Sequence, residues 1–243
     1  MTTPALTPNA WLRWDLIRRE LHAQPAGARI LEVGMGRGAV GARLAEHLTY
    51  TGVEPDERSR TAAVQVLGPR GRALADVSEL EATDRFDVLC SFEVLEHIDD
   101  DHAALAAWVD HLEPGGRVWV SVPAHQDRFS AADAAVGHLR RYGREDLRSL
   151  LESAGLDDVR IDSIGVPVGN VLEHGRNLVA RRRARGEASV EERTAASGRF
   201  LQPPQWVGGV TGAVMLPARW AQRPFRRTSA GPGWFAVARR PLA

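Results

Sequence analysis

A short apolar segment followed by a glycine-rich turn constrains the fold of this 243-residue chain more than any other feature. Residues 28–34, ARILEVG, are typical of a buried strand, and residues 38–48, GAVGARLAEHL, are typical of a helix. The turn between them contains Gly34, Gly36 and Gly38, which allow a backbone to bend sharply and to approach a ligand closely. Strand, turn and helix in this order predict the first unit of a parallel sheet covered by helices.

The alternation of strand-like and helix-like segments continues along the chain. Further strands are expected at residues 50–54, 72–75, 86–91, 115–123, 158–166 and 234–240. Before the first strand, residues 7–21 have a Thr-Pro start and an apolar stripe typical of a helix. We therefore predict an α/β fold of the Rossmann-like type, with a doubly wound, mostly parallel seven-stranded sheet and helices on both faces. Ligands bind such sheets at the carboxyl ends of the strands.

Composition and length favour a single domain over residues 1–243. Within it we expect an N-terminal helix in residues 1–25, a core in 27–165, a helical insertion in 167–233 and a last strand in 234–240. With 44% hydrophobic residues the chain can bury a core, and its one Cys cannot form an internal disulfide. Because the chain has no apolar run of 18 residues and no signal-peptide pattern, we expect no membrane-spanning helix and a cytoplasmic location.

The charges are unevenly distributed although the net charge is zero. Residues 1–160 carry 18 Arg and 26 acidic residues, and residues 161–243 carry 13 Arg and 5 acidic residues, which gives net charges of −8 and +8. All 31 basic residues are Arg. The Arg run is short and has no interleaved aromatic residues, so we expect no nucleic-acid partner.

Two overlapping patterns at the glycine-rich turn favour different ligands. Residues 36–41 match G-x-G-x-x-G, which is typical of dinucleotide binding, whereas residues 32–38 read E-x-G-x-G-x-G. A carboxylate at Glu32 would oppose a pyrophosphate but could orient a cationic amino-acid group. Glu54, at the end of the second strand, could accept protons from ribose hydroxyls, which suits any adenosine ligand. The residues alone leave both a dinucleotide and a ligand with a cationic amino-acid group open, and they favour the ligand with the amino-acid group.

Four segments in order resemble the motifs of class I S-adenosylmethionine-dependent methyltransferases: ILEVGMGRG, GVEPD, FDVLCSFEVLEHI and LEPGGRVWVSVP. The similarity runs from about residue 27 to 165 and is greatest to the small-molecule branch that contains the ubiquinone-biosynthesis O-methyltransferases. It implies transfer of a methyl group from S-adenosylmethionine, with S-adenosylhomocysteine as product, to an oxygen, or less favourably a nitrogen or carbon, of a small apolar metabolite. The alternatives are a non-methylating, cyclase-like or binding protein with the same cofactor pocket, and a nicotinamide oxidoreductase.

The resemblance also assigns cofactor-binding residues. Glu32 and the three alternate glycines would hold the methionine end, and Glu54 the ribose. Asp76, after the third strand, would accept a hydrogen bond from the adenine amino group. Ser91 and Phe92, after the fourth strand, would line the adenosine and methionine side.

A cluster of ionisable residues follows the fourth strand. Glu93, Glu96 and His97 are spaced as E-x-x-E-H, which would place them on one face of a helical turn. The motif resembles the metal site of ubiquinone O-methyltransferases and small-RNA 2′-O-methyltransferases, so Mg²⁺ is one expectation and these three residues are its candidate ligands. The alternatives are His97 as a general base and the whole run as the floor of the site.

The loop after the fifth strand supplies acceptor-side candidates. We consider His138 as a base, with His125, Arg140, Arg141 and Tyr142 as neighbours of the acceptor. The proposed catalytic residues are therefore Glu93, His97 and His138. For the two arginines the alternative is pairing with acidic residues of the same loop.

Residues 167–233 are expected to form a lid with helices at 169–185 and 205–222. The second helix is apolar and has Trp206 and Trp220 near its ends, and the Arg-rich stretch 176–185 belongs to the first. Three roles are open for the insertion: a roof over an apolar acceptor, a peripheral contact with an anionic membrane, and a homodimer interface.

Overall fold

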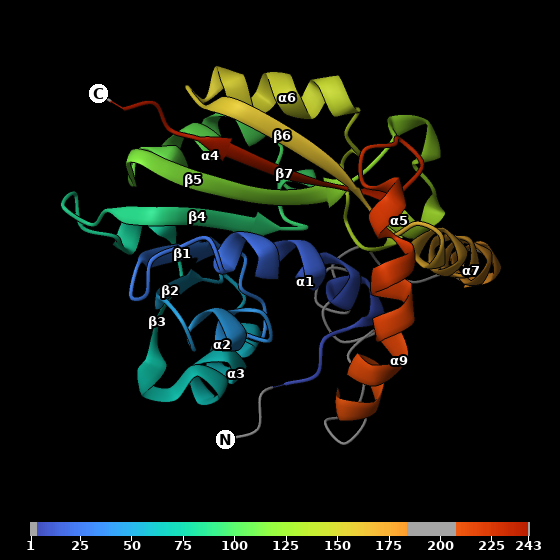
Figure 1. Cartoon of the computed structure of the whole chain (residues 1–243), viewed down its shortest axis with the longest axis horizontal. Coiled ribbons are helices and arrows are strands. Elements are labelled where there is room, and N and C mark those ends of the chain that lie inside the picture. Colours follow the sequence, from blue (N-terminus) through green and yellow to red (C-terminus); the bar gives the residue numbers. More distant parts are fainter. Residues whose placement is uncertain (1–3, 184–207, 243) are drawn as a thin grey trace.

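The computed structural model describes residues 4–183 and 208–242, which build one mixed sheet flanked by helices (Figure 1). The strand order is β3-β2-β1-β4-β5-β7-β6. All pairings among the first five strands are parallel, and β7 runs antiparallel to both of its neighbours. The strands are β1 (Arg29–Val33), β2 (Thr49–Val53), β3 (Gly71–Leu74), β4 (Phe86–Phe92), β5 (Leu112–Pro123), β6 (Asp157–Ile164) and β7 (Gly233–Arg239). The predicted Rossmann-like, mostly parallel seven-stranded sheet is confirmed.

The helices begin at polar caps that the sequence supplies. Thr7 accepts a hydrogen bond from the Ala10 amide, and Asp56 and Asp100 cap the two following long helices. The long helices are α1 (Pro8–Leu21), α3 (Glu57–Leu67), α4 (Asp101–Val109), α6 (Arg144–Ser153), α7 (Val168–Arg183) and α9 (Gly208–Ala221), and the short ones are α2 (Gly41–Leu44) and α5 (Ala131–Ala135).

Two expectations about helices were wrong in detail. The helix expected at 38–48 is reduced to the single turn of α2. Its Gly41 packs directly on the Tyr50 hydroxyl, and 3₁₀-type hydrogen bonds return the chain quickly to β2. The second difference is α5, which forms where the sequence predicted only a loop; Ser130 and Asp133 cap it reciprocally.

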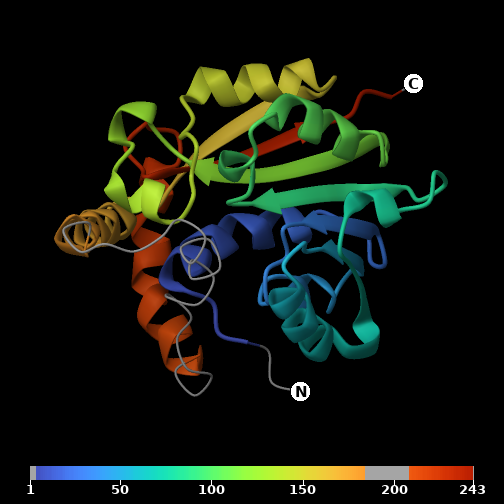
Figure 2. The same cartoon turned by 180° about the vertical axis from the view of Figure 1, so that it is seen from behind.

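Alternate strand residues face two separate apolar layers. Leu31 and Val118 belong to the layer covered by α4 and α6, whereas Ile30 and Trp119 belong to the layer covered by α1, α2, α3 and α9. The two views of the molecule show the same division (Figures 1 and 2). A sheet buried on both faces explains why the strands are apolar throughout rather than alternating.

The N-terminal helix and the helix before β7 are joined by buried polar contacts. Asp15 of α1, almost fully buried, pairs with Arg219, Arg223 and Arg226. Gln222 donates to the Leu12 carbonyl at 2.8 Å and accepts from the Gly165 amide at 3.2 Å. These contacts fix α1 across the carboxyl edge of the sheet.

The order of the strands places a ligand site at the β1–β4 boundary. From β1 the chain proceeds outward to β2 and β3, and from β4 it proceeds in the opposite direction, so this boundary is the topological switch point. Among the described residues no helix is long and apolar enough to cross a membrane.

Candidate active site

The glycine-rich turn after β1 is packed on two sides and open at its centre. Gly34 has a φ of 80°, and a Cβ there would lie 2.2 Å from the Val94 side chain. A Cβ at Gly38 would lie 3.2 Å from Ala63 of α3. At Gly36 a Cβ would meet no protein atom within 4 Å. The middle glycine therefore faces the space in which a ligand can approach the backbone.

Glu32 lies beneath this turn rather than at its surface. Its side chain is buried and accepts a hydrogen bond of 2.6 Å from the Tyr50 hydroxyl. Burial raises the pKa of Glu32 to about 7, although the hydrogen bond from Tyr50 and the charge of Arg13 act in the opposite direction. In this arrangement the carboxyl group supports the turn from below.

Glu54 links the end of β2 to the open centre of the turn. One carboxylate oxygen accepts from the Gly36 amide at 2.8 Å and the other from the Asp56 amide at 3.0 Å. The side chain is half-buried, so free lone pairs remain for a ribose. Asp76 lies after β3 as expected and is exposed; it caps the turn Val77–Glu79, and hydrogen bonds from Ser78 lower its pKa.

The two residues predicted to line the cofactor end β4. Ser91 is buried, and its hydroxyl has no hydrogen-bond partner within the described part of the chain. Phe92 stacks on Phe235 with 6.5 Å between ring centroids. A buried hydroxyl without a partner at the β1–β4 boundary could form a hydrogen bond with a bound ligand.

Arg13 is a site residue that the sequence reasoning missed. It projects from α1, is 11% exposed, and donates to the Ser121 hydroxyl at 2.8 Å. The same nitrogen is 3.5 Å from a Glu93 carboxylate oxygen, and the guanidinium lies 5.7 Å from the Phe92 ring centroid. Arg13 had been treated as part of an amphipathic helix, and no pattern in the sequence joins residue 13 to residue 93.

The three acidic and imidazole groups of the E-x-x-E-H run do not share one helical face, so that prediction was wrong. Glu93 has a φ of 60°, which non-glycine residues rarely adopt, and it precedes the 3₁₀ turn Leu95–His97. Its carboxylate accepts a hydrogen bond from Ser121 at 3.0 Å. With this unusual backbone, the carboxylate of Glu93 contacts Arg13 of α1 and Ser121 of β5.

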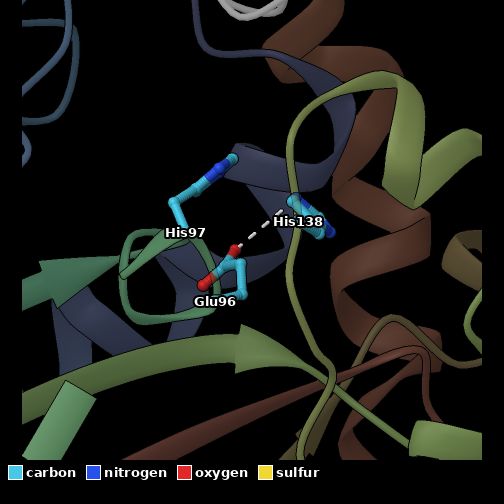
Figure 3. Close-up of side chains that lie close together, drawn as sticks. All are labelled: Glu96, His97 and His138. Atoms are coloured by element: carbon cyan, nitrogen blue, oxygen red, sulfur yellow. Dashed lines mark ion pairs between the residues drawn. The ribbon is translucent and has the colours of Figure 1, made fainter. Parts of the chain in front are cut away.

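Glu96 and His97 instead gather with His138, and possible ligand atoms of these three residues lie within 4.8 Å of one another (Figure 3). Glu96 is fully buried, and its carboxyl oxygens lack hydrogen-bond partners among the residues described. Burial, with the charge of Glu93 next, raises its pKa well above the usual range. Burial, with His138 beside it, lowers the pKa of His97, whose Nδ1 lies 3.1 Å from the Gly137 carbonyl. Two imidazoles and a nearby carboxyl group form a donor set that fits a divalent cation.

His138 is oriented by Asp133 of α5. Its Nδ1 lies 3.2 Å from an Asp133 oxygen, and its Nε2 lies 3.8 Å from Glu96. Although burial opposes the shift, hydrogen bonds from His138, Arg141 and Ser130 lower the pKa of Asp133. A carboxylate that stays charged beside Nδ1 favours the tautomer with a free Nε2.

An open pocket with a cavity volume of about 60 Å³ adjoins these groups. Its polar lining comes from α1, the end of β4, the loop before α6, and α7: Asn9, Arg13, Glu93, His138, Glu173 and Arg176. Leu12, Pro123, Ile164 and Pro232 supply its apolar surface. His138 is the one acceptor-side candidate from the loop after β5 that lines the pocket, and His97 does not line it.

The other candidates from that loop hold the structure together. Arg140 pairs with Asp101 at 2.9 Å, and Tyr142 donates to the same carboxylate at 2.7 Å. Arg141 is buried against Asp133, and His125 packs on Trp234 with 5.1 Å between ring centroids. The alternative of pairing within the loop is correct for Arg141.

Part of the predicted lid can be placed. The helix predicted at 169–185 is α7, which contributes to the pocket wall, and the helix predicted at 205–222 is α9. Trp220 is 67% exposed and does not line the pocket. Trp206 and the stretch 184–207 lie outside the described residues.

Comparison with known proteins identifies the family of this chain. A family model described as a methyltransferase domain matches residues 9–161. A probable S-adenosylmethionine-dependent methyltransferase of Mycolicibacterium smegmatis is 30% identical, over 73% of this chain and 73% of that protein. A ubiquinone biosynthesis O-methyltransferase of Xanthomonas axonopodis pv. citri is 31% identical over 48% of this chain, and the match spans 57% of that protein's length.

Solved structures share the fold. The cyclase SpnF superposes with a TM-score of 0.62 and 17% identity, covering 95% of this chain and 82% of that one. Phosphoethanolamine N-methyltransferase 2 of Haemonchus contortus, in complex with S-adenosyl-L-methionine, superposes with a TM-score of 0.59 and 19% identity, covering 95% and 53%. With the matched family model and the glycine-rich edge described above, these findings show that the chain belongs to the methyltransferase-domain family, among the S-adenosylmethionine-dependent methyltransferases.

Proposed function

We propose that this methyltransferase transfers the methyl group to an oxygen atom of a small molecule bound in the pocket beside Glu93. The observation that carries the proposal is the position of this pocket, which reaches the ends of β4 and β5 at Glu93 and Pro123. Val94, the residue after Glu93, packs against Gly34 of the glycine-rich turn. Methyl transfer is an in-line displacement, so the protein mainly has to align the acceptor oxygen with the methyl carbon and sulfur.

The cofactor would lie along the ends of β1, β2 and β4. Gly36 offers open backbone to the methionine portion, Glu54 accepts from the ribose, and Asp76 accepts from the adenine amino group. Ser91 supplies an unused hydroxyl beside the ligand. Arg13 adds a role that the sequence did not suggest, because its guanidinium is placed to hold the cofactor's carboxylate.

Two groups are placed to take the acceptor's proton. Glu93 is 41% exposed in the pocket and is fixed by Ser121, and His138 lines the same pocket with Nδ1 held by Asp133. Replacing Glu93 by Gln, or His138 by Asn, would distinguish them, because loss of the base lowers kcat about 10²- to 10⁴-fold. Loss of the other group would change mainly KM.

The polar lining favours an acceptor with polar groups over the wholly apolar metabolite expected from the sequence. Six of the lining residues are polar or charged. Against a purely apolar molecule, those donors and lone pairs that have no partner within the protein would stay unpaired, at a cost of about 1–3 kcal/mol each.

A metal-assisted reaction is the second form of this proposal. Glu96, His97 and His138 would hold the ion, which would lower the pKa of the acceptor hydroxyl. Treatment with EDTA followed by Mg²⁺ or Mn²⁺ tests it: loss and recovery of turnover, with unchanged cofactor affinity, would support the metal. Full turnover in EDTA would exclude the metal-assisted reaction and support proton removal by a base without a metal.

Calorimetric titration and a label-transfer assay test the proposed function. S-adenosylmethionine should bind and NAD should not. Label from the methyl group should then appear in an acceptor from fractionated small-molecule extracts, attached to oxygen. Binding without any transfer would favour the non-methylating alternative. The absence of a nucleic-acid partner, the cytoplasmic location, membrane contact and dimer formation stay predictions.

A further inference from the structure

The acceptor pocket has a charged wall on α7 in addition to the groups beside the cofactor. Glu173 and Arg176 lie one helical turn apart on α7, and both line the pocket. Glu93 and Arg13 line it from the end of β4 and from α1. The acceptor is therefore bounded by charged groups from three elements.

Arg141 pairs with both carboxylates on the α7 side, Asp133 and Glu173. Its side chain is completely buried, and it donates two hydrogen bonds of 2.9 and 2.8 Å to Asp133. It also donates to Glu173 at 2.5 Å. Asp133 further accepts from the Ser130 amide and hydroxyl at 2.8 Å. Asp133, the carboxylate that Arg176 approaches, thus has most of its lone pairs occupied by other groups, and Glu173 is engaged by Arg141.

Arg176 is left without a comparable partner in the described part of the chain. Its nearest carboxylate oxygen, on Asp133, is 3.9 Å away, which is beyond hydrogen-bond distance. Its Nε is buried and has no hydrogen-bond partner. The side chain is one-third exposed and lines the pocket. A guanidinium that lies beside a carboxylate already occupied by other donors, and that lines a pocket, is arranged to bind an anion from outside the protein.

We propose that the acceptor carries an anionic oxygen group, a carboxylate or a phosphate, and that Arg176 binds it. This inference rests on the proposed function, since it places the methylated hydroxyl beside Glu93 and His138 and the anionic group toward α7. The planar guanidinium can bind either group through two parallel hydrogen bonds.

Binding of three small probes with the same ring tests the inference. With the enzyme saturated with S-adenosylhomocysteine, benzoate, phenyl phosphate and benzyl alcohol are titrated and followed by calorimetry or ligand-observed NMR. At least one anion should bind about tenfold or more tightly than benzyl alcohol, since hydrogen bonds to charged groups are the strong ones. The tighter of the two anions identifies the group.

Substitutions then assign the effect to one side chain. Arg176→Gln should reduce anion affinity to the level of benzyl alcohol, and Arg176→Lys should retain part of it. Arg128→Gln is the matched control: Arg128 approaches Glu173 at 3.9 Å and is similarly exposed but does not line the pocket, so anion affinity should stay within about twofold.

Two results would overturn the inference: no preference of the wild-type enzyme for either anion, or equal anion affinity in the wild type and Arg176→Gln. The preference of the wild type is measured without any variant, so a misfolded variant would not leave the question open. A parallel titration with S-adenosylmethionine distinguishes failure of the proposed function from failure of this inference. If the cofactor does not bind, the proposed function is contradicted. If the cofactor binds normally but neither anion is preferred, only the anionic acceptor is contradicted.

Discussion

The carboxyl edge of the sheet consists of two halves that are built differently. The cofactor half, at the ends of β1, β2, β3 and β4, is formed by short contiguous motifs whose backbone amides and carboxylates bond locally, as Glu54 does with Gly36. The acceptor half, at the ends of β5 and β6 and the start of β7, brings together Glu93, His138 and Arg176 from distant parts of the chain. Local backbone geometry maintains the first, and buried ion pairs between helices maintain the second.

This difference implies different responses to mutation. In the cofactor half a change should affect the turn and the cofactor together, because the turn itself is the binding surface. In the acceptor half the networks around Asp15 and Arg141 lie behind the pocket wall, so a change there should first loosen the helices that carry the wall.

The largest effect is expected in the acceptor half, from Asp15→Ala. This substitution leaves Arg219, Arg223 and Arg226 without their shared buried partner and should lower the free energy of unfolding by about 3–5 kcal/mol. Chemical denaturation measures it, with the exposed Asp157→Ala as control. A loss below about 1 kcal/mol would mean that the ion cluster does not hold α1 to α9.

In the cofactor half, Glu32 should make stability depend on pH. Its pKa is raised from 4.5 to about 7 in the folded protein, so folding favours the protonated form. The contribution is complete below about pH 4.5 and is lost as the pH rises to 7, which amounts to about 3 kcal/mol. Glu32→Gln keeps an acceptor for Tyr50 but cannot ionise, so its stability relative to the wild type should increase over this interval. A constant difference between the two proteins from pH 5 to 8 would contradict the assignment.

Two glycine substitutions separate folding from ligand binding within the turn. Gly34→Ala places a methyl group against Val94 at a positive φ and should cost about 2–3 kcal/mol of stability. Gly36→Ala meets no protein atom and should cost only about 1–2 kcal/mol, yet it should abolish cofactor binding by occupying the ligand's space. Equal cofactor affinity in Gly36→Ala and the wild type would show that the ligand does not approach this glycine.

The smallest effect concerns the ribose. Glu54→Ala removes the proposed hydroxyl acceptor and one bond to Gly36, and should weaken S-adenosylmethionine binding by about 1–3 kcal/mol. Affinity for the acceptor-site probes should not change, because Glu54 does not line that pocket. Unchanged cofactor affinity in a calorimetric titration would remove Glu54 from the cofactor site.

The same two halves explain what the sequence could predict. Strand and helix order, the glycine-rich turn and the places of Glu54, Asp76 and Ser91 follow from local periodicity and contiguous motifs, so they were predicted. Spacing also predicted that Glu93, Glu96 and His97 share one helical face. A positive φ at Glu93 places this residue outside the helical turn, and no residue pattern predicts that conformation.

Arg13 and Arg176 could not be found in the same way. Each lies on an amphipathic helix, where an Arg is ordinarily a solvated surface residue. Their roles depend on how α1 and α7 cross the sheet edge, and those crossings are determined by Asp15, Arg141 and their partners. Long-range pairing of this kind has no signature in a single sequence.

A crystal structure of the complex with S-adenosylhomocysteine tests the division of the edge most directly. We expect the adenosine along Glu54 and Asp76, the amino-acid carboxylate on Arg13, and the sulfur facing the pocket between Glu93 and His138. If the ligand binds with its sulfur turned away from that pocket, or occupies the pocket itself, the assignment of separate cofactor and acceptor halves is wrong.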